Sequence, residues 1–299
     1  MTDPLTQTMA LLRPRTVFTK GISGAGRWAV RYSEFGQPSF CTVLNGSCRL
    51  ALDGLEPVTV QAGDFLLLPA TPGFTMSGFE PAMPVMMDAQ AEASTKGEVR
   101  HGRQDGPPDV QLLGGWFLFD SPDADLLITQ LPPLVLLRDA DRSGRVVRLL
   151  REEALEDRAG RDLVLARLME VLLVEALRNV QDDTPAGLLR GLADPRLADT
   201  LRLIHGDPAG NWTVGRLADA AALSRSAFFE RFTRVVGAAP MEYLLTWRMA
   251  LARDMLRARQ LPLAEVAERT GYGSPSAFST AFARYTGVPP GRFAREAAA

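Results

Sequence analysis

The chain has 299 residues, enough for two domains of ordinary size, and a net charge of −2 that is unevenly distributed. Residues 196–299 carry 14 arginines, no lysine and nine acidic residues, a net charge of +5, which leaves −7 on residues 1–195. The sequence has no apolar run long enough to span a bilayer, no signal-peptide pattern and only two cysteines, which excludes a membrane-spanning protein and a disulfide framework. We expect a cytoplasmic protein with a basic binding module after an acidic module; chance variation along a neutral chain is the alternative.

The first half of the chain has the pattern of short strands, from Trp28 to about Phe79. Two apolar-rich segments flank Asn45-Gly46, the preferred two-residue type I′ turn, and therefore predict a β-hairpin. The expected strands are residues 39–44, 47–52, 58–60 and 65–69, with residues 116–119 as a late strand. Strands of this length and spacing predict a small barrel or sandwich.

The segment of residues 43–69 resembles a cupin barrel. The residues that carry this resemblance are Asn45-Gly46, Ala62-Gly63-Asp64 and Leu67-Leu68-Pro69. Many cupins are metalloenzymes, and metal sites in such barrels usually need two or more inward histidines and a carboxylate. This chain has only His101 and His205, and neither lies in the strand motifs, so we expect no metal and no cofactor.

A barrel of this kind can hold a small organic ligand between its strands. The apolar candidates for the lining of such a pocket are Phe40, Cys41, Val43, Cys48, Leu50, Phe65 and Leu67. The alternative is that these side chains only fill a core, as buried apolar residues commonly do.

The two cysteines, Cys41 and Cys48, allow a redox-switch hypothesis. In the expected hairpin Cys48 faces Val43, so the two cysteines lie diagonally on one face. Diagonal neighbours have Cβ atoms about 7–8 Å apart, whereas a disulfide requires about 4 Å. We therefore expect two buried thiols that act as small apolar groups, with the redox switch as the alternative.

Residues 143–180 have the apolar repeat of two helices separated by Ala159-Gly160. In the second helix the repeat consists of Leu165, Leu168, Met169, Leu172, Ala176 and Val180. This helix is apolar around much of its circumference, so it packs on two sides. One side can cover the barrel, and the other can meet a second subunit or another part of the same chain. The polar segment 181–187, which contains proline and glycine, is the best linker candidate.

The last third of the chain contains one segment twice, at residues 224–240 and 274–290. The identical positions are Ser224/Ser274, Ser226/Ser276, Ala227/Ala277, Phe228/Phe278, Phe232/Phe282, Arg234/Arg284, Gly237/Gly287 and Pro240/Pro290. Helical patterns cover residues 195–206, 213–222, 225–236, 240–259, 263–270 and 274–285. Two copies are too few for a solenoid, so the pattern predicts two helix-turn-helix units joined by a long helix that begins at Pro240.

The two copies share the apolar face of one helix and carry polar or variable residues on its opposite face. The shared face consists of Ala227, Phe228 and Phe232 in the first copy and of Ala277, Phe278 and Phe282 in the second. The opposite face carries Ser226, Phe229, Glu230 and Thr233 in the first copy and Ser276, Ser279, Thr280 and Ala283 in the second. We interpret the shared face as core and the opposite face as the surface that reads two base sequences.

These motifs make the C-terminal third resemble the AraC/XylS family of bacterial transcription regulators. The motifs that carry the resemblance are Thr213-Val214, Leu217-Ala218, Ser224-Arg225-Ser226-Ala227-Phe228, Trp247-Arg248-Met249, Val266-Ala267, Gly271-Tyr272, Phe278-Ser279, Phe282 and Gly287-Val288-Pro289-Pro290. The front half resembles the cupin-like sensor domain of one branch of that family, including Asp3-Pro4-Leu5 and Leu131-Pro132-Pro133. The resemblance implies two helix-turn-helix units on a rigid helix, each inserting one helix into the major groove about one turn apart.

By position, the resemblance assigns two groups of residues to DNA. The base-facing residues are Ser226, Phe229, Glu230, Pro275, Ser276, Ser279 and Thr280, and the candidate phosphate contacts are Arg225, Arg231, Arg234, Arg248 and Arg284. Phosphate contacts supply affinity and salt dependence rather than sequence choice, and the alternative for each arginine is a solvated charged face.

The chain departs from the family pattern at several of these positions. Many members have arginine at the positions of Glu230 and Thr280. Glutamate cannot read guanine as arginine does, but it can accept from cytosine N4 or orient a neighbouring arginine. Related sensor domains often have histidine where this chain has Cys41, and near Ala70 and Phe74, which weakens the case for a metal or a polar ligand.

We therefore expect an α+β protein with three segments. These are a cupin-like sensor barrel at residues 1–135, a helical connector with possible dimerisation helices at 136–185, and a DNA-binding domain with two helix-turn-helix units at 195–299. The expected function is a sequence-specific transcription regulator of double-stranded DNA, controlled by a small organic ligand. RNA polymerase, by the family resemblance, and a second copy of the chain are further expected partners. The alternatives are a cupin enzyme fused to a DNA-binding domain and a protein-interaction scaffold.

Overall fold

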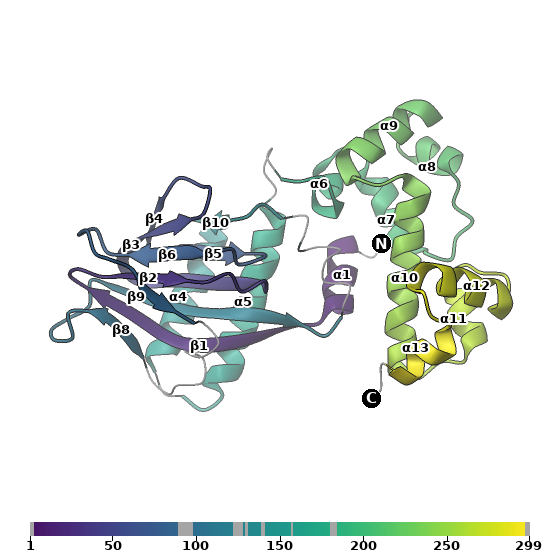
Figure 1. Ribbon diagram of the computed structural model, residues 1–299. Coiled ribbons are helices and arrows are strands. Elements are labelled where there is room, and N and C mark those ends of the chain that lie inside the picture. Colours follow the sequence, from purple (N-terminus) through teal and green to yellow (C-terminus); the bar gives the residue numbers. More distant parts are fainter. Residues whose placement is uncertain are drawn as a thin grey trace. The chain divides into compact units, whose positions relative to one another are not determined.

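The computed structural model describes residues 3–88, 98–121, 128, 131–138, 141–156, 158–179 and 184–296, and the chain divides into two compact units (Figure 1). The helical unit comprises Met1–Arg13, Ser121–Gln130 and Thr184–Ala299. The β unit comprises Pro14–Asp120 and Leu131–Asp183. Among the helices that the structure describes, none is both long and apolar enough to cross a membrane.

The β unit is built on one curled, mixed sheet (Figure 1). Its strands are β1 (Pro14–Ala25), β2 (Ala29–Tyr32), β3 (Ser39–Leu52), β4 (Val58–Gln61), β5 (Phe65–Leu68), β6 (Phe74–Ser77), β7 (Val85–Met87), β8 (Val99–Gly102), β9 (Val110–Phe119) and β10 (Val135–Leu137). The main path of the sheet has the order β7-β2-β6-β3-β9-β1-β8, and off this path β4 and β5 pair with β3 and β10 pairs with β5. The curled sheet confirms the cupin-like fold expected for this half of the chain.

The prediction of a β-hairpin at Asn45-Gly46 is wrong, because the single strand β3 runs through these residues without turning. Gly46 has a φ of +72°, and the pairing of β3 with β9 shifts register between Val43 and Asn45, which marks a β-bulge. A Cβ at Gly46 would overlap the carbonyl oxygen of Asp109, so the position requires glycine. Pairing with β9 along both sides of the bulge therefore replaces the local turn that an Asn-Gly pair favours in isolation.

The connector consists of two helices, α4 (Asp141–Leu155) and α5 (Arg161–Arg178), which lie against one face of the sheet (Figure 1). The break between them lies at the expected Gly160, which has a φ of +82°. The buried residues of α5 are Leu165, Met169, Leu172, Leu173, Ala176 and Leu177. The pair of helices α4 and α5 also exposes apolar side chains, at Leu149, Leu155, Leu163, Val164 and Val171. One side of the connector therefore covers the barrel, as expected.

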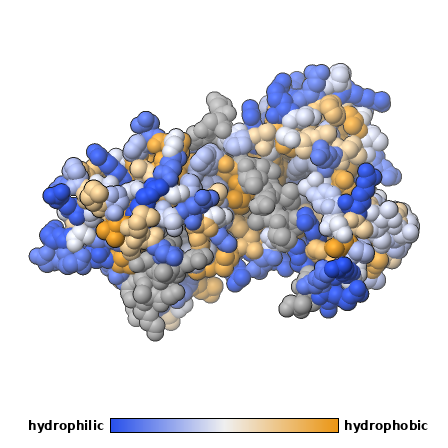
Figure 2. Space-filling model, viewed as in Figure 1, coloured by the Kyte–Doolittle hydropathy of each residue, from blue (hydrophilic) through white to orange (hydrophobic). Residues whose placement is uncertain are grey.

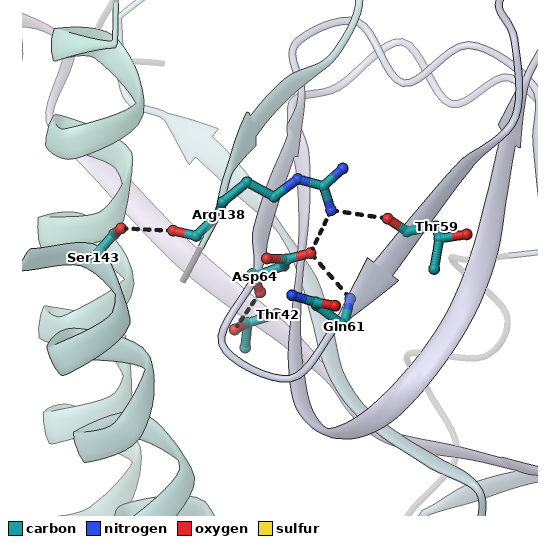
Figure 3. Close-up of polar contacts among 6 residues, drawn as sticks. All are labelled: Thr42, Thr59, Gln61, Asp64, Arg138 and Ser143. Atoms are coloured by element: carbon teal, nitrogen blue, oxygen red, sulfur yellow. Dashed lines mark hydrogen bonds and ion pairs between the residues drawn. The ribbon is translucent and has the colours of Figure 1, made fainter. Parts of the chain in front are cut away.

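A buried carboxylate ties the turn before β5 to the segment that follows β10 (Figure 3). The side chain of Asp64 is fully buried, and its Oδ2 accepts hydrogen bonds from Arg138 Nη1 at 2.8 Å and from the backbone N–H of Gln61 at 3.0 Å. The same Nη1 donates to the carbonyl of Thr59 at 2.8 Å, and the Ser143 hydroxyl donates to the carbonyl of Arg138 at 3.3 Å. A buried charge is tolerated only when it is paired and hydrogen-bonded, so this contact holds the start of α4 against the barrel.

The helical unit consists of two helix-turn-helix cores on one long helix, α10 (Pro240–Ala258). The other helices are α1 (Pro4–Leu12), α6 (Leu188–Ala193), α7 (Ala198–Gly206), α8 (Val214–Ala220), α9 (Arg225–Val236), α11 (Leu263–Arg269), α12 (Pro275–Thr286) and α13 (Pro290–Glu296). The expected helices of the last third are present with nearly the expected bounds. The sequence did not predict α1, α6 and α13 as separate helices.

The two cores of the helical unit are separate clusters that share α10. Leu244, Trp247 and Ala250 of α10 belong to the first cluster, with Phe228 and Phe232 of α9. Met249, Ala252 and Leu256 of α10 belong to the second cluster, with Phe278 and Phe282 of α12. Because the two sets lie on different faces of the helix, α10 is buried on both sides and sets the position of one core against the other.

The N-terminal helix α1 packs within the helical unit, although the expected domain ranges place it with the barrel. The Asp3 carboxylate caps the helix by accepting the N–H of Thr6 at 2.9 Å. Leu11 belongs to the first core, and Arg13 pairs with Asp254 of α10 at 3.0 Å. The sequence did not show this packing because an amphipathic helix does not specify which distant surface covers its apolar side.

A buried histidine lies between α7 and α10 of the helical unit. His205 is 1% exposed, and its Nε2 lies 2.7 Å from the hydroxyl of Tyr243. Its ring stacks on Trp247 with 4.1 Å between centroids. Burial lowers the pKa of His205 to about 3, against a smaller raising effect of the Asp3 charge. His205 is therefore neutral in the folded protein at neutral and mildly acidic pH.

We expect Arg138→Met to lower the free energy of unfolding of the β unit by about 1–3 kcal/mol, because the buried carboxylate of Asp64 loses its cation. The exposed pair of Arg15 and Asp120, at 2.9 Å, provides the matched control, since Arg15→Met removes an ion pair that solvent screens. Urea denaturation of the full-length variants, followed by tryptophan fluorescence, measures both effects. Equal losses for the two substitutions would show that the buried contact adds no stability.

We expect the helical unit to lose stability as the pH falls below about 6.5, by at most about 1.4 kcal/mol per pH unit. The folded pKa of His205, about 3, lies below its unfolded value, so the unfolded chain binds more protons within this window and gains stability as pH falls. His205→Gln should abolish this pH-dependent loss of stability, because Gln does not titrate and can still hydrogen-bond to the Tyr243 hydroxyl. Urea midpoints at pH 7 and pH 5 test this, and parallel losses in wild type and variant would contradict it.

Candidate nucleic-acid interface and ligand cavity

The candidate recognition helices α9 and α12 begin and end with the same local signals. The hydroxyl oxygens of Ser224 and Ser274 accept the backbone N–H three residues ahead, at 3.3 and 3.2 Å. Each helix ends at a glycine in the left-handed region, Gly237 with φ +81° and Gly287 with φ +80°. The serine N-caps and the glycine C-caps depend only on neighbouring residues, so the duplicated sequence forms two helices of the same length.

The shared phenylalanines hold both helices onto the rest of the helical unit, whereas the shared Ala227 and Ala277, predicted to lie on the same buried face, are exposed. Phe228, Phe232, Phe278 and Phe282 are 0% exposed, and the two rings of each helix lie 5.5 Å apart between centroids. This confirms the prediction that the repeated phenylalanines form the core face. Because each helix is locked by this face, its opposite face is presented to solvent in a defined orientation.

The residues predicted to face DNA bases lie on that opposite face. Ser226, Phe229, Glu230, Pro275, Ser276 and Thr280 are exposed, and Ser279 is half-buried. Phe229 is 44% exposed, which is unusual for a large apolar side chain on a helix whose other phenylalanines are buried. In α12 the hydroxyls of Ser279 and Thr280 donate to the carbonyls of Pro275 and Ser276, at 2.7 and 3.1 Å.

Three of the five predicted phosphate contacts are exposed: Arg225, Arg234 and Arg284. None of the three has an ion pair or side-chain hydrogen bond with a residue that the structure describes. The Arg225 guanidinium lies against the first turn of α8, where a Cβ at Gly215 would come within 3.0 Å of its Nε. Hydrophilic residues cover much of the visible surface over α8 and α9 (Figure 2). These arginines are therefore available to an anionic partner.

The other two predicted phosphate contacts, Arg231 and Arg248, have partners inside the helical unit. Arg231 Nη2 lies 2.9 Å from Asp194 Oδ2, and Arg248 donates to the carbonyls of Pro208 and Gly210 at 2.7 and 3.0 Å. Burial lowers the pKa of Arg248. Burial alone would raise the pKa of Asp194, but hydrogen bonds from Arg231 and from backbone N–H groups hold it below its ordinary value. Both arginines hold the scaffold together.

One sequence signal could have separated these two arginines from the exposed ones. Arg231 stands three residues after Phe228 and directly before Phe232, at the edge of the buried face of α9. Arg248 directly follows the buried Trp247 on α10. A charged residue at the boundary of a buried face is half-covered, and it stabilises the fold when a carboxylate or carbonyl lies within reach.

The β unit contains a cavity of about 80 Å³ between its strands. Its wall is mainly aromatic and aliphatic, with Tyr32, Phe35, Phe74, Leu66 and Trp116 among the lining residues. The lining includes no charged side chain among the described residues. At one side the Thr71 hydroxyl donates to Ser39 Oγ at 2.8 Å, so the polar groups there are hydrogen-bonded to each other. The arrangement can hold a small, uncharged organic molecule.

Three of the seven residues proposed to line a ligand pocket border this cavity, and four do not. Phe40, Cys41 and Leu50 border the cavity, whereas Val43, Cys48, Phe65 and Leu67 do not and are buried elsewhere in the core. On β5 the cavity is lined by Leu66 and Leu68 instead. All four residues of β5 are buried, so its apolar sequence does not reveal which alternate side chains face inward.

Cys41 and Cys48 are both free thiols. They lie on one continuous strand, and the expected cross-strand pairing of Cys48 with Val43 does not occur. Burial raises the pKa of Cys48 to about 12 and also raises that of Cys41. The thiolate is the reactive form of cysteine, so burial keeps both side chains in the unreactive thiol form.

The two histidines lie in different units and in different environments. His101 stacks on Trp28 in the β unit with 5.8 Å between ring centroids, and His205 contacts Tyr243 in the helical unit. Within the described ranges, no three histidine, cysteine or acidic side chains are grouped so that they could hold a metal ion.

Comparison with known proteins identifies both halves of the chain. Residues 3–182 match the cupin family model, and residues 217–296 match a helix-turn-helix domain model. An AraC-like transcription regulator of Streptomyces lividans is 37% identical to this chain over 97% of both proteins. The chain belongs to the AraC-like family of transcription regulators. A second AraC-like regulator, of Streptomyces antibioticus, is 37% identical over 97% of this chain and 98% of its own length.

Two further similar proteins match only part of the chain. The transcriptional regulator AlkR of Acinetobacter baylyi is 39% identical over 42% of each protein. The solved DNA-binding domain of AdpA, in complex with a target DNA, is 31% identical, with a TM-score of 0.33 and coverage of 34% of this chain and 92% of that domain. The two full-length matches to AraC-like regulators and the two domain matches confirm the family resemblance expected from the sequence.

Proposed function

We propose that this AraC-like protein is a sequence-specific DNA-binding regulator that inserts α9 and α12 into successive major grooves of a promoter. The observation that carries the proposal is the duplicated helix with a buried, shared face and an exposed, different face. Two such helices on one rigid helix suit a double-stranded helix that repeats about every 34 Å. We propose no catalytic step for this protein.

The charges of the helical unit support DNA as its partner. Residues 196–299 carry a net charge of +5, and Arg225, Arg234 and Arg284 are exposed and unpaired among the described residues. Basic side chains that lie next to a recognition helix neutralise phosphates and fix the register of the protein on the duplex. The base-facing residues between them then select the sequence.

The cavity of the β unit supports control by a small molecule. We propose that its ligand is uncharged and largely apolar, because the described lining offers aromatic and aliphatic surface and no ionic partner. Such a ligand can change promoter engagement only if it binds one state of the protein more tightly than another. Cys41, which borders the cavity and whose thiol pKa is raised by burial, contributes an apolar wall in this proposal.

The exposed apolar residues of the connector support a homodimer. Leu149 of α4 and Leu163 and Val171 of α5 are 54%, 62% and 39% exposed, on a hairpin whose other side packs on the sheet. Isolated exposed apolar residues are common, but several on one helical hairpin are typical of an interface. RNA polymerase is the further proposed partner, by family membership.

We expect Arg225→Ala to weaken binding to all DNA sequences and to reduce by about one the slope of log affinity against log salt concentration. Arg167, a 68% exposed arginine of α5, is the matched control, because Arg167→Ala makes the same charge change outside the helical unit. Gel-shift titrations at several salt concentrations measure both variants. Equal slopes for Arg225→Ala and wild type would remove Arg225 from the interface.

We expect uncharged aromatic or aliphatic compounds to raise the melting temperature of the protein in a thermal-shift screen, because they bind the folded cavity. Cys41→Leu, which adds bulk to the cavity wall, should abolish that shift and leave the DNA footprint intact. Cys48→Ala, which removes the other buried thiol without filling the cavity, should keep the shift. A ligand that stabilises wild type and Cys41→Leu equally would bind elsewhere.

A further inference from the structure

The base-facing sides of α9 and α12 offer hydrogen-bond acceptors and apolar groups but few donors. The residues concerned are Ser226, Phe229, Glu230, Pro275, Ser276, Ser279 and Thr280. None of them is arginine, lysine, asparagine or glutamine, the side chains that donate to guanine or adenine in the major groove. The shortage of donors limits which base edges these two helices can recognise.

The hydroxyl protons of α12 are already used within the helix. Ser279 Oγ donates to the carbonyl of Pro275 at 2.7 Å, and Thr280 Oγ1 donates to the carbonyl of Ser276 at 3.1 Å. A hydroxyl has one proton and two lone pairs, so each of these groups faces outward as an acceptor. The methyl group of Thr280 and the ring of Pro275 add apolar surface beside them. The exposed part of α12 therefore matches amino groups and methyl groups on DNA.

The exposed part of α9 has the same character with a charge added. Glu230 is exposed and has no ion pair or hydrogen bond through its carboxylate to any residue within the described ranges. The neighbouring Arg231 is paired with Asp194, so it does not neutralise Glu230. A free carboxylate repels the O6 and N7 acceptors of guanine and accepts from the amino group of cytosine. Phe229, 44% exposed, offers a flat apolar surface for thymine methyl groups.

We infer that this regulator reads its two half-sites through exocyclic amino groups and thymine methyl groups, and not through the O6 and N7 acceptors of guanine. In the α9 half-site, Glu230 accepts from cytosine N4 and Phe229 packs on a thymine methyl. In the α12 half-site, the methyl of Thr280 packs on thymine, and the hydroxyl oxygen of Ser279 accepts from an amino group. The inference deepens the proposed DNA-binding function and rests on it.

The inference is tested on a DNA site that the full-length protein selects from a random pool. Replacing each contacted thymine by deoxyuridine, which lacks only the methyl group, should weaken binding about fourfold per contacted methyl. Replacing guanines of the half-sites by 7-deazaguanine, which lacks only the N7 acceptor, should change affinity less than about twofold. A tenfold loss with 7-deazaguanine, or no loss with deoxyuridine, would overturn the inference.

Two conservative substitutions of Thr280 separate the role of its methyl group from that of its hydroxyl. Thr280→Val keeps the methyl and removes the hydroxyl, so it should keep the sequence preference of the α12 half-site. Thr280→Ser keeps the hydroxyl and removes the methyl, so it should bind thymine and deoxyuridine sites equally at that position. The reverse result would show that the hydroxyl reads the base, contrary to the inference.

The role of Glu230 is tested by a substitution that adds a hydrogen-bond donor and leaves the size of the side chain unchanged. Glu230→Gln adds a donor, so it should shift the preferred base from cytosine towards adenine at one position of the α9 half-site and leave the α12 half-site unchanged. An unchanged preference would remove Glu230 from base recognition. If the wild-type protein enriches no sequence at all, the proposed DNA-binding function fails and this inference fails with it. An enriched site whose guanines are essential would contradict the inference alone.

Discussion

The helical unit depends on one constraint, which is that α10 is buried on two faces at once. Trp247 belongs to the first core and Met249, two residues later, belongs to the second. Residues two positions apart on a helix point about 200° apart, so the alternation sends each side chain to its own core. The helix has 19 residues and is therefore about 28 Å long, close to one turn of DNA. This single element sets the spacing of the two candidate recognition helices, α9 and α12.

The arginines of the helical unit fall into two groups. Arg248 lies at the edge of the buried side of α10, and its guanidinium donates to two backbone carbonyls of the loop before α8. Arg231 pairs with Asp194 and so fixes the position of α9. These contacts orient the scaffold. Arg225 and Arg284 lie on the exposed sides of the duplicated segments and keep their charge for an external partner. In our proposal, sequence specificity is left to side chains that accept hydrogen bonds or offer methyl groups.

The β unit shows how long-range pairing overrides a local preference. Asn45-Gly46 favours a tight turn when it stands alone, yet β9 pairs with β3 from Ser39 through Gly46, and a bulge between Val43 and Asn45 replaces the turn. The bulge lets one strand pair with β5 before it and with β4 and β6 after it, which curls the sheet around the cavity. Sequence reasoning found the cupin fold. Three of its seven pocket candidates border the cavity, whereas on β5 the cavity is bordered by Leu66 and Leu68 and not by the candidates Phe65 and Leu67.

The sequence by itself determined what depends on residues a few positions apart. Serine caps, glycine stops and the repeated phenylalanines specify two helix-turn-helix units, and their motifs specify the AraC-like family. Only the tertiary structure decided that α1 packs in the helical unit, that Arg231 belongs to the scaffold and that Gly46 bends a strand. Each of these outcomes depends on a partner far along the chain, Asp254, Asp194 and Asp109 respectively, and no local pattern encodes such a partner.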